Sequence, residues 1–112
     1  MIYQPKSGDI VWIDFNPQTG HEQCSRRPVL IVWGNDALKM IPMMSQVCAI
    51  SNTDNGFPLH IPLDDKSINT TGFILCEQNR VFDLEARNAE YKDVVSAEVL
   101  KKVKDILRAL LD

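Results

Sequence analysis

A short polar segment carries most of the residues that could do chemistry. Within seven residues it supplies an imidazole, a carboxylate and two guanidinium groups, from His21, Glu22, Arg26 and Arg27. Pro28 follows directly and restricts the backbone where Arg27 enters the next apolar run. An arginine held in this way can be preorganised to bind an anion. The residues alone leave two interpretations open: a solvated loop with an incidental ion pair, or a site for a phosphate group.

Cleavage of RNA without a metal ion is one reaction that this set of side chains would suit. The 2′-hydroxyl of the RNA attacks the adjacent phosphate, so a protein must take the hydroxyl proton, stabilise the five-coordinate phosphorus and protonate the leaving 5′-oxygen. The fork of a guanidinium matches two phosphate oxygens. A carboxylate or an imidazole can transfer the protons, each contributing roughly 10²–10⁴-fold.

Other kinds of site find little support in the sequence. It contains no GxxxxGK[ST] or GxGxxG phosphate-binding motif. Neither His21 nor His60 is spaced with cysteine or carboxylate as in a metal site, so we expect no metal and no cofactor. The three cysteines are irregularly spaced and predict no disulfide framework. Cys48 and Cys76 lie in apolar runs and are expected in the core, whereas Cys24 lies in the polar segment.

Length and composition indicate a single soluble domain. The chain has 112 residues, of which 45% are hydrophobic and 24% charged. The net charge of −3 argues against a broadly basic nucleic-acid-binding surface, but it allows a small enzyme with a local basic cleft. No apolar run approaches the roughly 20 residues that span a bilayer, and the first residues lack the apolar stretch of a signal peptide. We therefore expect a cytoplasmic protein.

Short apolar runs separated by turn residues predict strands over the first two-thirds of the chain. The polar connections between them are 16–27, 52–56 and 64–70. The run at 28–33 is apolar on both faces and predicts a central strand. The run at 57–63 contains two prolines, which remove ladder donors and predict an edge strand. The other expected strands are 8–15 and 71–77, and 79–82 either extends the second of these or pairs beside it. The segment 40–51 is a further apolar stretch.

The pattern changes to a helical period after Ser96, a good N-cap residue. One face of the expected helix is apolar, with Val99, Leu100, Val103, Ile106, Leu107, Leu110 and Leu111. The opposite face is basic and is expected to be solvated rather than bound to RNA; it carries Lys101, Lys102, Lys104 and Arg108. These elements predict a mainly β fold with helices: a small, strongly curved sheet or partial barrel, with the polar connection 16–27 over one end.

Four segments in order resemble the MazF/PemK/Kid family of toxins, and the resemblance covers nearly the whole chain. They are GDIVWIDFNPQTGHEQ, RRPVLIV, NTDNGFPLHIPL and TTGFILCEQNRVFDLEARNA, and the closing helix follows them. The resemblance implies an SH3-like curved sheet or partial barrel and a homodimer. It also implies cleavage of single-stranded RNA at short sequences without metal, leaving 2′,3′-cyclic phosphate and 5′-hydroxyl ends. The partner it implies is a cognate antitoxin, whose disordered C-terminal segment covers the RNA-binding surface.

The resemblance also assigns residues to catalysis. Arg27 matches the arginine of the family's RP motif and would stabilise the transition-state charge, with proton donation as a second role. Ser51 matches the family's Thr or Ser position before the G-[FY]-P segment. Glu22 matches the acidic residue of the GxEQ motif, and His21 a histidine of the PemK/Kid branch. Glu77 matches a carboxylate proposed as the base in the Kid branch, so the base remains open among Glu22, Glu77 and His21.

Further residues are expected to contact RNA. They are Gln23, Arg26, Asn52, Phe57, Gln78, Arg80 and Arg87. Phe57 could stack on an unpaired base, although we expect its ring to be buried in the core.

Two features depart from the family pattern. Ala49 stands where the family usually has proline, and the segment 33–46 is unusually apolar, as core, dimer contact or altered RNA surface. The alternatives to an endoribonuclease are a CcdB-like toxin that binds a protein target and a catalytically inactive relative.

Overall fold

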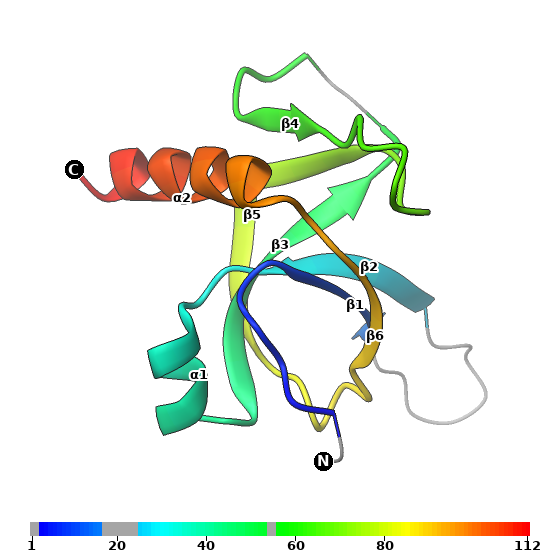
Figure 1. Cartoon of the computed structure of the whole chain (residues 1–112), viewed down its shortest axis with the longest axis vertical. Helices are drawn as coiled ribbons and strands as arrows, with labels where there is room; N and C mark the ends of the chain where they lie inside the picture. Colours follow the sequence, from blue (N-terminus) through cyan, green and yellow to red (C-terminus); the bar gives the residue numbers. More distant parts are fainter. Residues whose placement is uncertain (1–2, 17–24, 54–55) are drawn as a thin grey trace.

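The fold is a single curled antiparallel sheet with two helices (Figure 1). The computed structural model describes residues 3–16, 25–53 and 56–112. The sheet order is β4-β5-β3-β2-β1-β6, and each neighbouring pair is antiparallel. The described elements are β1 (Asp9–Asn16), β2 (Ser25–Ile31), α1 (Asn35–Met40), β3 (Met44–Ser51), β4 (His60–Pro62), β5 (Phe73–Asp83), β6 (Glu90–Val94) and α2 (Ala97–Leu111).

The predicted fold class and most predicted strands are confirmed. β2 lies in the interior of the sheet between β1 and β3, and β4 lies at one edge, as their sequence patterns predict. The tract 79–82 extends the preceding strand, because β5 runs without a break from Phe73 to Asp83. The C-terminal helix begins after Ser96, whose side chain accepts a hydrogen bond from the Val99 N–H at 3.2 Å.

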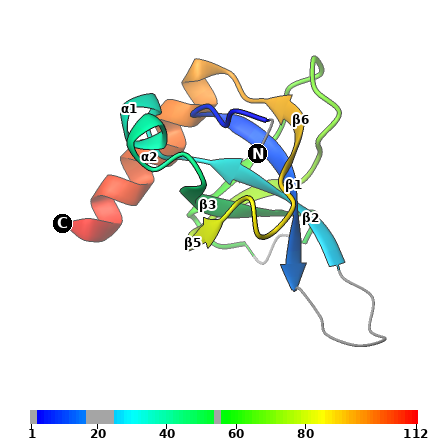
Figure 2. The ribbon, with the colours of Figure 1, turned by 90° about the horizontal axis from the view of Figure 1, so that it is seen from below.

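The polar connection is shorter than expected, because Arg26 and Arg27 belong to β2 and not to a loop. The expectation of a loop over 16–27 failed because polar residues at the end of a sheet can still pair with a neighbouring strand. Arg26 pairs with Asp14 and Arg27 with Ile13 of β1, so the backbone of both arginines is part of the ladder. Figure 2 shows β1 and β2 extending together away from the helices.

Two elements were not predicted, α1 and β6. α1 has six residues, too few for a periodic signal, and β6 is half exposed, so it shows no apolar run. Both depend on tertiary partners: Leu38 of α1 is buried, and β6 pairs with β1. Part of the segment 33–46 is therefore core, although the side chains of Met40, Ile41 and Met43 are exposed.

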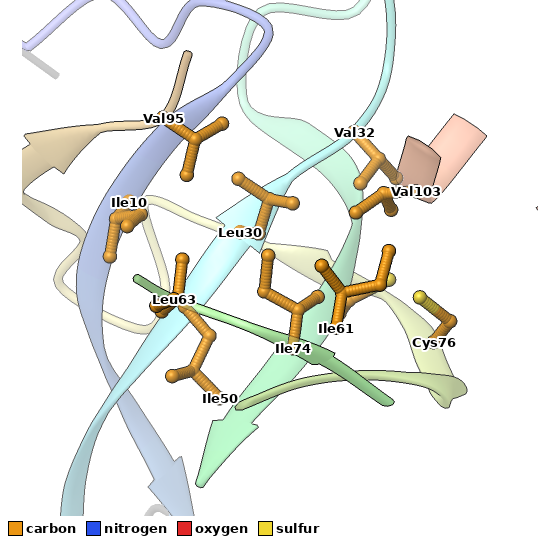
Figure 3. Packing of buried hydrophobic residues seen from close by; sticks show 11 residues of the cluster. Ile10, Leu30, Val32, Ile50, Ile61, Leu63, Ile74, Cys76, Val95 and Val103 are labelled. Carbon is orange, nitrogen blue, oxygen red and sulfur yellow. The ribbon is translucent and has the colours of Figure 1, made fainter. Parts of the chain in front are cut away.

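Each face of the sheet packs into its own core, because side chains alternate along each strand. One core contains Ile10, Leu30 and Ile74 and is covered by Val103 of α2 (Figure 3). The other contains residues from β1, β2, β3 and β5 and is covered by Leu38 of α1. The two helices therefore cover opposite faces and leave the far end of β2 exposed.

Cys48 and Cys76 are both buried in the core, as predicted. Their side chains are in contact, and the hydrogen bond with Cys76, together with burial, raises the pKa of the Cys48 thiol well above its usual range. The Cys48 thiol therefore stays protonated at neutral pH.

Candidate active site

A cleft opens where β2 and β3 separate. β3 pairs with β2 only through Val29–Ile31, whereas the first half of β2, residues 25–28, pairs with β1 alone. Beyond Ala49, β3 continues along β5 and leaves β2 (Figure 1). The space between the two strands is a cleft of about 330 Å³. Its walls include Phe15, Arg27, Pro28, Ala49, Ser51 and Gln78.

Arg27 and Ser51 meet at this cleft from different strands. Val29 pairs with Ala49, and Arg27 and Ser51 each lie two residues beyond that pair in the same direction. Because side chains alternate, both project to the face of Val29 and Ala49. Both residues line the cleft, so the structure brings together the two positions that the family resemblance singled out. Their roles in catalysis stay predictions.

The hydroxyl of Ser51 is held by the turn that follows it. Its Oγ accepts a hydrogen bond from the Thr53 N–H at 3.1 Å, so the hydroxyl hydrogen can be donated to another group. Gly72 packs against the Ser51 backbone: a Cβ on Gly72 would lie 2.5 Å from the Ser51 carbonyl oxygen. Asn52 accepts a hydrogen bond from the Thr71 hydroxyl at 3.2 Å. Two neighbouring segments therefore fix the end of β3.

A bulge in β5 brings Gln78 to the cleft. Cys48 pairs with Asn79, but the next residue, Ala49, pairs with Leu75, so residues 76–78 have no partner on β3. The Asn79 amide donates to the Cys76 carbonyl oxygen at 2.9 Å and closes the bulge. Leu75 and Gln78 both line the cleft, which a regular strand could not achieve at a spacing of three.

Glu77 lies in the same bulge at the margin of the cleft. Its neighbours Leu75 and Gln78 line the cleft, whereas Glu77 pairs with His60 of β4 at 2.9 Å, between Oε2 and Nε2. The sequence treats His60 as one residue of an edge strand and gives no sign of this contact. The alternation in LHIPL turns Leu59, Ile61 and Leu63 to the core and His60 to the other face, so it does not point to this contact either.

Phe57 is not buried, contrary to the expectation. The residue is 54% exposed, and its ring meets the His60 ring edge-on, with centroids 5.5 Å apart. The expectation failed because β4 begins only at His60, so Phe57 precedes the ladder and does not share its alternation. The exposed ring keeps base stacking available.

Arg26, expected to contact RNA, is engaged in ion pairs on the other face of β2. Its guanidinium donates to the Asp14 carboxylate at 2.6 Å and to the Glu90 carboxylate at 3.1 Å. A further bond, at 3.1 Å, goes to the Asn88 carbonyl oxygen. Because side chains alternate, Arg26 points away from the face that carries Arg27. Arg26 therefore ties β2 to β1 and β6.

Arg87 also serves the fold. Its guanidinium donates to the carbonyl oxygens of Asp14 and Phe15, at 3.0 and 2.6 Å, and lies 4.0 Å from the centroid of the Phe82 ring. Arg80 is exposed and lies 5.0 Å from the same centroid. Of these two cations expected to contact RNA, Arg80 is the more accessible.

Several predicted residues lie outside the described residues: His21, Glu22, Gln23 and Cys24. Within residues 3–16, 25–53 and 56–112, no cluster of three or more His, Cys, Asp or Glu side chains could hold a metal ion. In the same ranges, neither helix is long and apolar enough to cross a membrane.

Comparison with known proteins identifies the family. The model of the PemK-like, MazF-like toxins of type II toxin–antitoxin systems matches residues 6–111. The chain belongs to this family. Like the MazF-like and PemK-like proteins that it resembles, it is an endoribonuclease.

Two relatives from Escherichia coli illustrate the similarity. The endoribonuclease PemK is 30% identical over 106 residues, which cover 93% of this chain and 80% of PemK. The endoribonuclease toxin MazF of strain K12 is 28% identical over 113 residues, covering 97% of this chain and 96% of MazF.

Solved MazF structures have the same fold. The crystal structure of MazE–MazF (Form-II) from Deinococcus radiodurans matches with a TM-score of 0.84 at 33% identity, over 97% of this chain and 96% of the matched chain. MazF (Form-I) from the same organism matches with a TM-score of 0.81 at 33% identity, over 97% of each chain. The curled sheet and the C-terminal helix are therefore the MazF architecture.

Proposed function

We propose that this MazF-like protein is a toxin that cleaves single-stranded RNA at short, selected sequences without a metal ion. The observation that carries the proposal is the placement of Arg27 and Ser51 in one cleft, on the strand ends where β2 and β3 separate. A guanidinium and a hydroxyl that face one space can both donate hydrogen bonds to the oxygens of a single phosphate group.

The proposed reaction is an internal transesterification. The 2′-oxygen of the RNA forms a bond to phosphorus and the bond from phosphorus to the 5′-oxygen breaks, which gives a 2′,3′-cyclic phosphate and a 5′-hydroxyl. A base takes the 2′-hydroxyl proton and an acid supplies one to the leaving oxygen. Arg27 and Ser51 stabilise the extra negative charge on the phosphate oxygens, and one such donor is typically worth roughly 10²–10³-fold.

Three residues remain candidates for the base: Glu22, His21 and Glu77. Glu77 is next in sequence to Gln78, which lines the cleft, and its carboxylate is held by His60. We assign the base to Glu77. Because Glu77 adjoins the cleft-lining Gln78 of β5 and Arg27 lines the cleft from β2, RNA bound there can bring its 2′-hydroxyl toward Glu77 and its phosphate to Arg27.

A small cleft limits how much RNA backbone the protein neutralises. Its volume of about 330 Å³ suits one nucleotide and its phosphate better than a long duplex. Gln78 can hydrogen-bond a base edge at the cleft, and the exposed Phe57 ring can stack on an unpaired base. Binding should weaken with salt along a shallow slope, since few phosphates are paired.

We also propose that a cognate antitoxin inhibits the protein and that the toxin is a homodimer. MazE–MazF complexes are among the similar solved structures. The antitoxin's disordered C-terminal segment would cover the cleft and exclude RNA.

Cleavage of a long, defined RNA in EDTA tests the proposal. We expect cuts at a small set of sequences, with 2′,3′-cyclic phosphate and 5′-hydroxyl ends, and loss of cutting in Arg27→Ala. RNA that stays intact with the purified wild-type chain contradicts the proposal. Growth arrest with intact bulk RNA would instead indicate a protein target, and a folded protein that neither cuts RNA nor arrests growth would indicate an inactive relative.

A further inference from the structure

The contact between His60 and Glu77 links the edge strand to the candidate base. The two residues come from different strands, β4 and β5, and Nε2 of His60 lies 2.9 Å from Oε2 of Glu77. At this distance a hydrogen on Nε2 is shared with the carboxylate, whether the imidazole is neutral or charged. One of the two carboxylate oxygens therefore has a fixed protein partner.

The exposed fractions of the two side chains separate their roles. The His60 side chain is 3% exposed and the Glu77 side chain 24%. Of the two side chains, only that of Glu77 has appreciable exposed surface, so the imidazole can act on RNA only through Glu77. This is the arrangement in which a buried group sets the orientation of a reacting one.

The second carboxylate oxygen of Glu77, Oε1, has surroundings unlike those of Oε2. Oε1 is buried, and no group among the described residues donates a hydrogen bond to it. An unsatisfied buried oxygen costs free energy. Because Oε1 is closed to solvent, a substrate hydroxyl can reach the carboxylate only at Oε2, the oxygen that His60 holds.

The surroundings of His60 hold its ring in place. His60 pairs with Leu75 across the β4–β5 ladder, and the neighbouring Cys76 N–H donates to the Leu59 carbonyl oxygen. The Phe57 ring packs edge-on against the imidazole. The backbone and one ring face of His60 are therefore fixed, so its contact with Glu77 is preorganised.

We propose that His60 is a positioning residue for RNA cleavage. Its Nε2–H holds Oε2 of Glu77 in place, and the other lone pair of Oε2 takes the proton of the 2′-hydroxyl as the 2′-oxygen bonds to phosphorus and the 5′-oxygen leaves. The inference rests on the proposed function, in which Glu77 is the base.

Single-turnover cleavage kinetics of the full chain test the role of His60. The set comprises wild type, His60→Ala, His60→Gln, Glu77→Gln and the His60→Ala/Glu77→Gln double variant. We expect His60→Ala to lower the cleavage rate roughly 10- to 100-fold, because a misplaced base loses rate steeply. The affinity for an RNA with a 2′-deoxy nucleotide at the cut site should change less than about threefold. His60→Gln keeps an N–H donor and should recover most of the rate.

The double variant and a structural control separate positioning from folding. In the Glu77→Gln background, His60→Ala should cause no further loss, because the group it orients is already gone. Ile61→Val alters the next residue of β4, whose side chain is buried in the core, and supplies a variant destabilised at the same strand. The melting temperature of Ile61→Val should fall about as much as that of His60→Ala, whereas its cleavage rate should stay close to that of wild type.

Two results would overturn the positioning role. The first is a double variant whose loss of cleavage rate equals the product of the losses in His60→Ala and Glu77→Gln. The second is a His60→Ala cleavage rate equal to that of Ile61→Val. Wild-type protein that leaves RNA intact overturns the proposed function, and this inference with it. Cleavage by wild type with an unaffected His60→Ala rate overturns this inference alone.

Discussion

Arg26 and Arg27 are neighbours in the chain, yet they lie in two regions of opposite character. Arg26 belongs to a set of paired charges, here called the Asp14 cluster, formed by Asp14, Arg26, Asn88 and Glu90. Arg27 faces the cleft, and no hydrogen bond or ion pair joins it to another described residue. Because one residue of offset in a strand reverses the face, the sheet gives one arginine a structural task and leaves the other for an anion.

The difference shows that the count of cations in a motif says little about binding. A guanidinium that already shares two carboxylates has its donors occupied and its charge offset, so it gains little from a phosphate. A guanidinium beside a hydroxyl and an amide at an open cleft retains both donors and charge. The Asp14 cluster should therefore affect stability, and the cleft should affect the reaction.

The largest expected effect is that of Arg27→Ala. We expect the cleavage rate to fall by about 10³-fold or more, because the charge on the phosphate loses its main donor. The melting temperature should stay within a few degrees of wild type, since the side chain is exposed. Single-turnover cleavage in EDTA and thermal unfolding measure the two quantities. A rate close to wild type would remove Arg27 from the catalytic machinery and break the contrast between the two regions.

Gly72→Ala should displace Ser51, which lines the cleft, through the backbone of β3. The added Cβ would meet the Ser51 carbonyl oxygen at 2.5 Å, and the φ of +104° at Gly72 disfavours any side chain. We expect a loss of about 1–3 kcal/mol in the free energy of unfolding and a cleavage rate lowered roughly tenfold through displacement of Ser51. Urea unfolding and cleavage assays check these values.

Gly34→Ala is the matched control for Gly72→Ala. A Cβ at Gly34 would meet no atom within 4 Å, and its φ of −66° suits alanine. We expect little change in stability or rate. Equal behaviour of the two variants would show that the contact between Gly72 and Ser51 does not position the site.

Arg26→Ala should have the reverse profile of Arg27→Ala. We expect the free energy of unfolding to fall by about 1 kcal/mol, because partly exposed ion pairs contribute little each and Asp14 keeps its bond from Asn88. The cleavage rate should remain within about threefold of wild type. Urea unfolding measures the first quantity and the EDTA cleavage assay the second. A loss of cleavage as large as that of Arg27→Ala would mean that both faces of β2 bind RNA.

The smallest effect is expected outside both regions, at Asp93 of β6. Although partial burial alone would raise the pKa of Asp93, hydrogen bonds from Thr70, Lys92 and the Asn69 N–H, together with the Lys92 charge, lower it below its ordinary 3.8. The folded carboxyl thus holds its proton less tightly than the unfolded one. Its stabilising contribution is present above pH 3.8 and is lost as the pH falls through the lower folded value.

Asp93→Asn makes this dependence measurable. The variant should be less stable than wild type at pH 7 by at most about 1 kcal/mol, and the gap should close below pH 3.8. Urea midpoints between pH 7 and pH 3 test this, with cleavage at pH 7 unchanged. A gap that is constant with pH would show that the Asp93 charge does not contribute to folding.

The sequence was informative where local pattern and burial agree. Apolar side chains on both faces of 28–33 predicted that β2 lies in the interior of the sheet, and two prolines predicted that β4 lies at its edge. The helical spacing of apolar residues after Ser96 predicted α2. Alternation and caps are local, so a single sequence shows them. The family fold followed from the ordered motifs and not from these patterns.

The site was less predictable, because it depends on register between strands distant in sequence. Nothing in residues 76–78 marks a bulge, since CEQ can belong to an ordinary strand; the bulge exists only relative to Cys48 and Ala49 of β3. The contact of His60 with Glu77 and the packing of Gly72 on Ser51 likewise join distant segments. Proximity of Arg27 and Ser51 was expected from the resemblance and not from their spacing.

The bulge in β5 also changes which face of the sheet the later side chains of the strand occupy. Its three unpaired residues reverse the alternation, so Ile74 faces one core while Phe82, eight residues later, faces the other. Deleting one residue between Leu75 and Asn79 would reduce the separation of Ile74 and Phe82 to seven, for which regular alternation already places the two side chains on opposite faces. Both cores would then be kept, and the loss would fall on the cleft, where the bulge places Gln78.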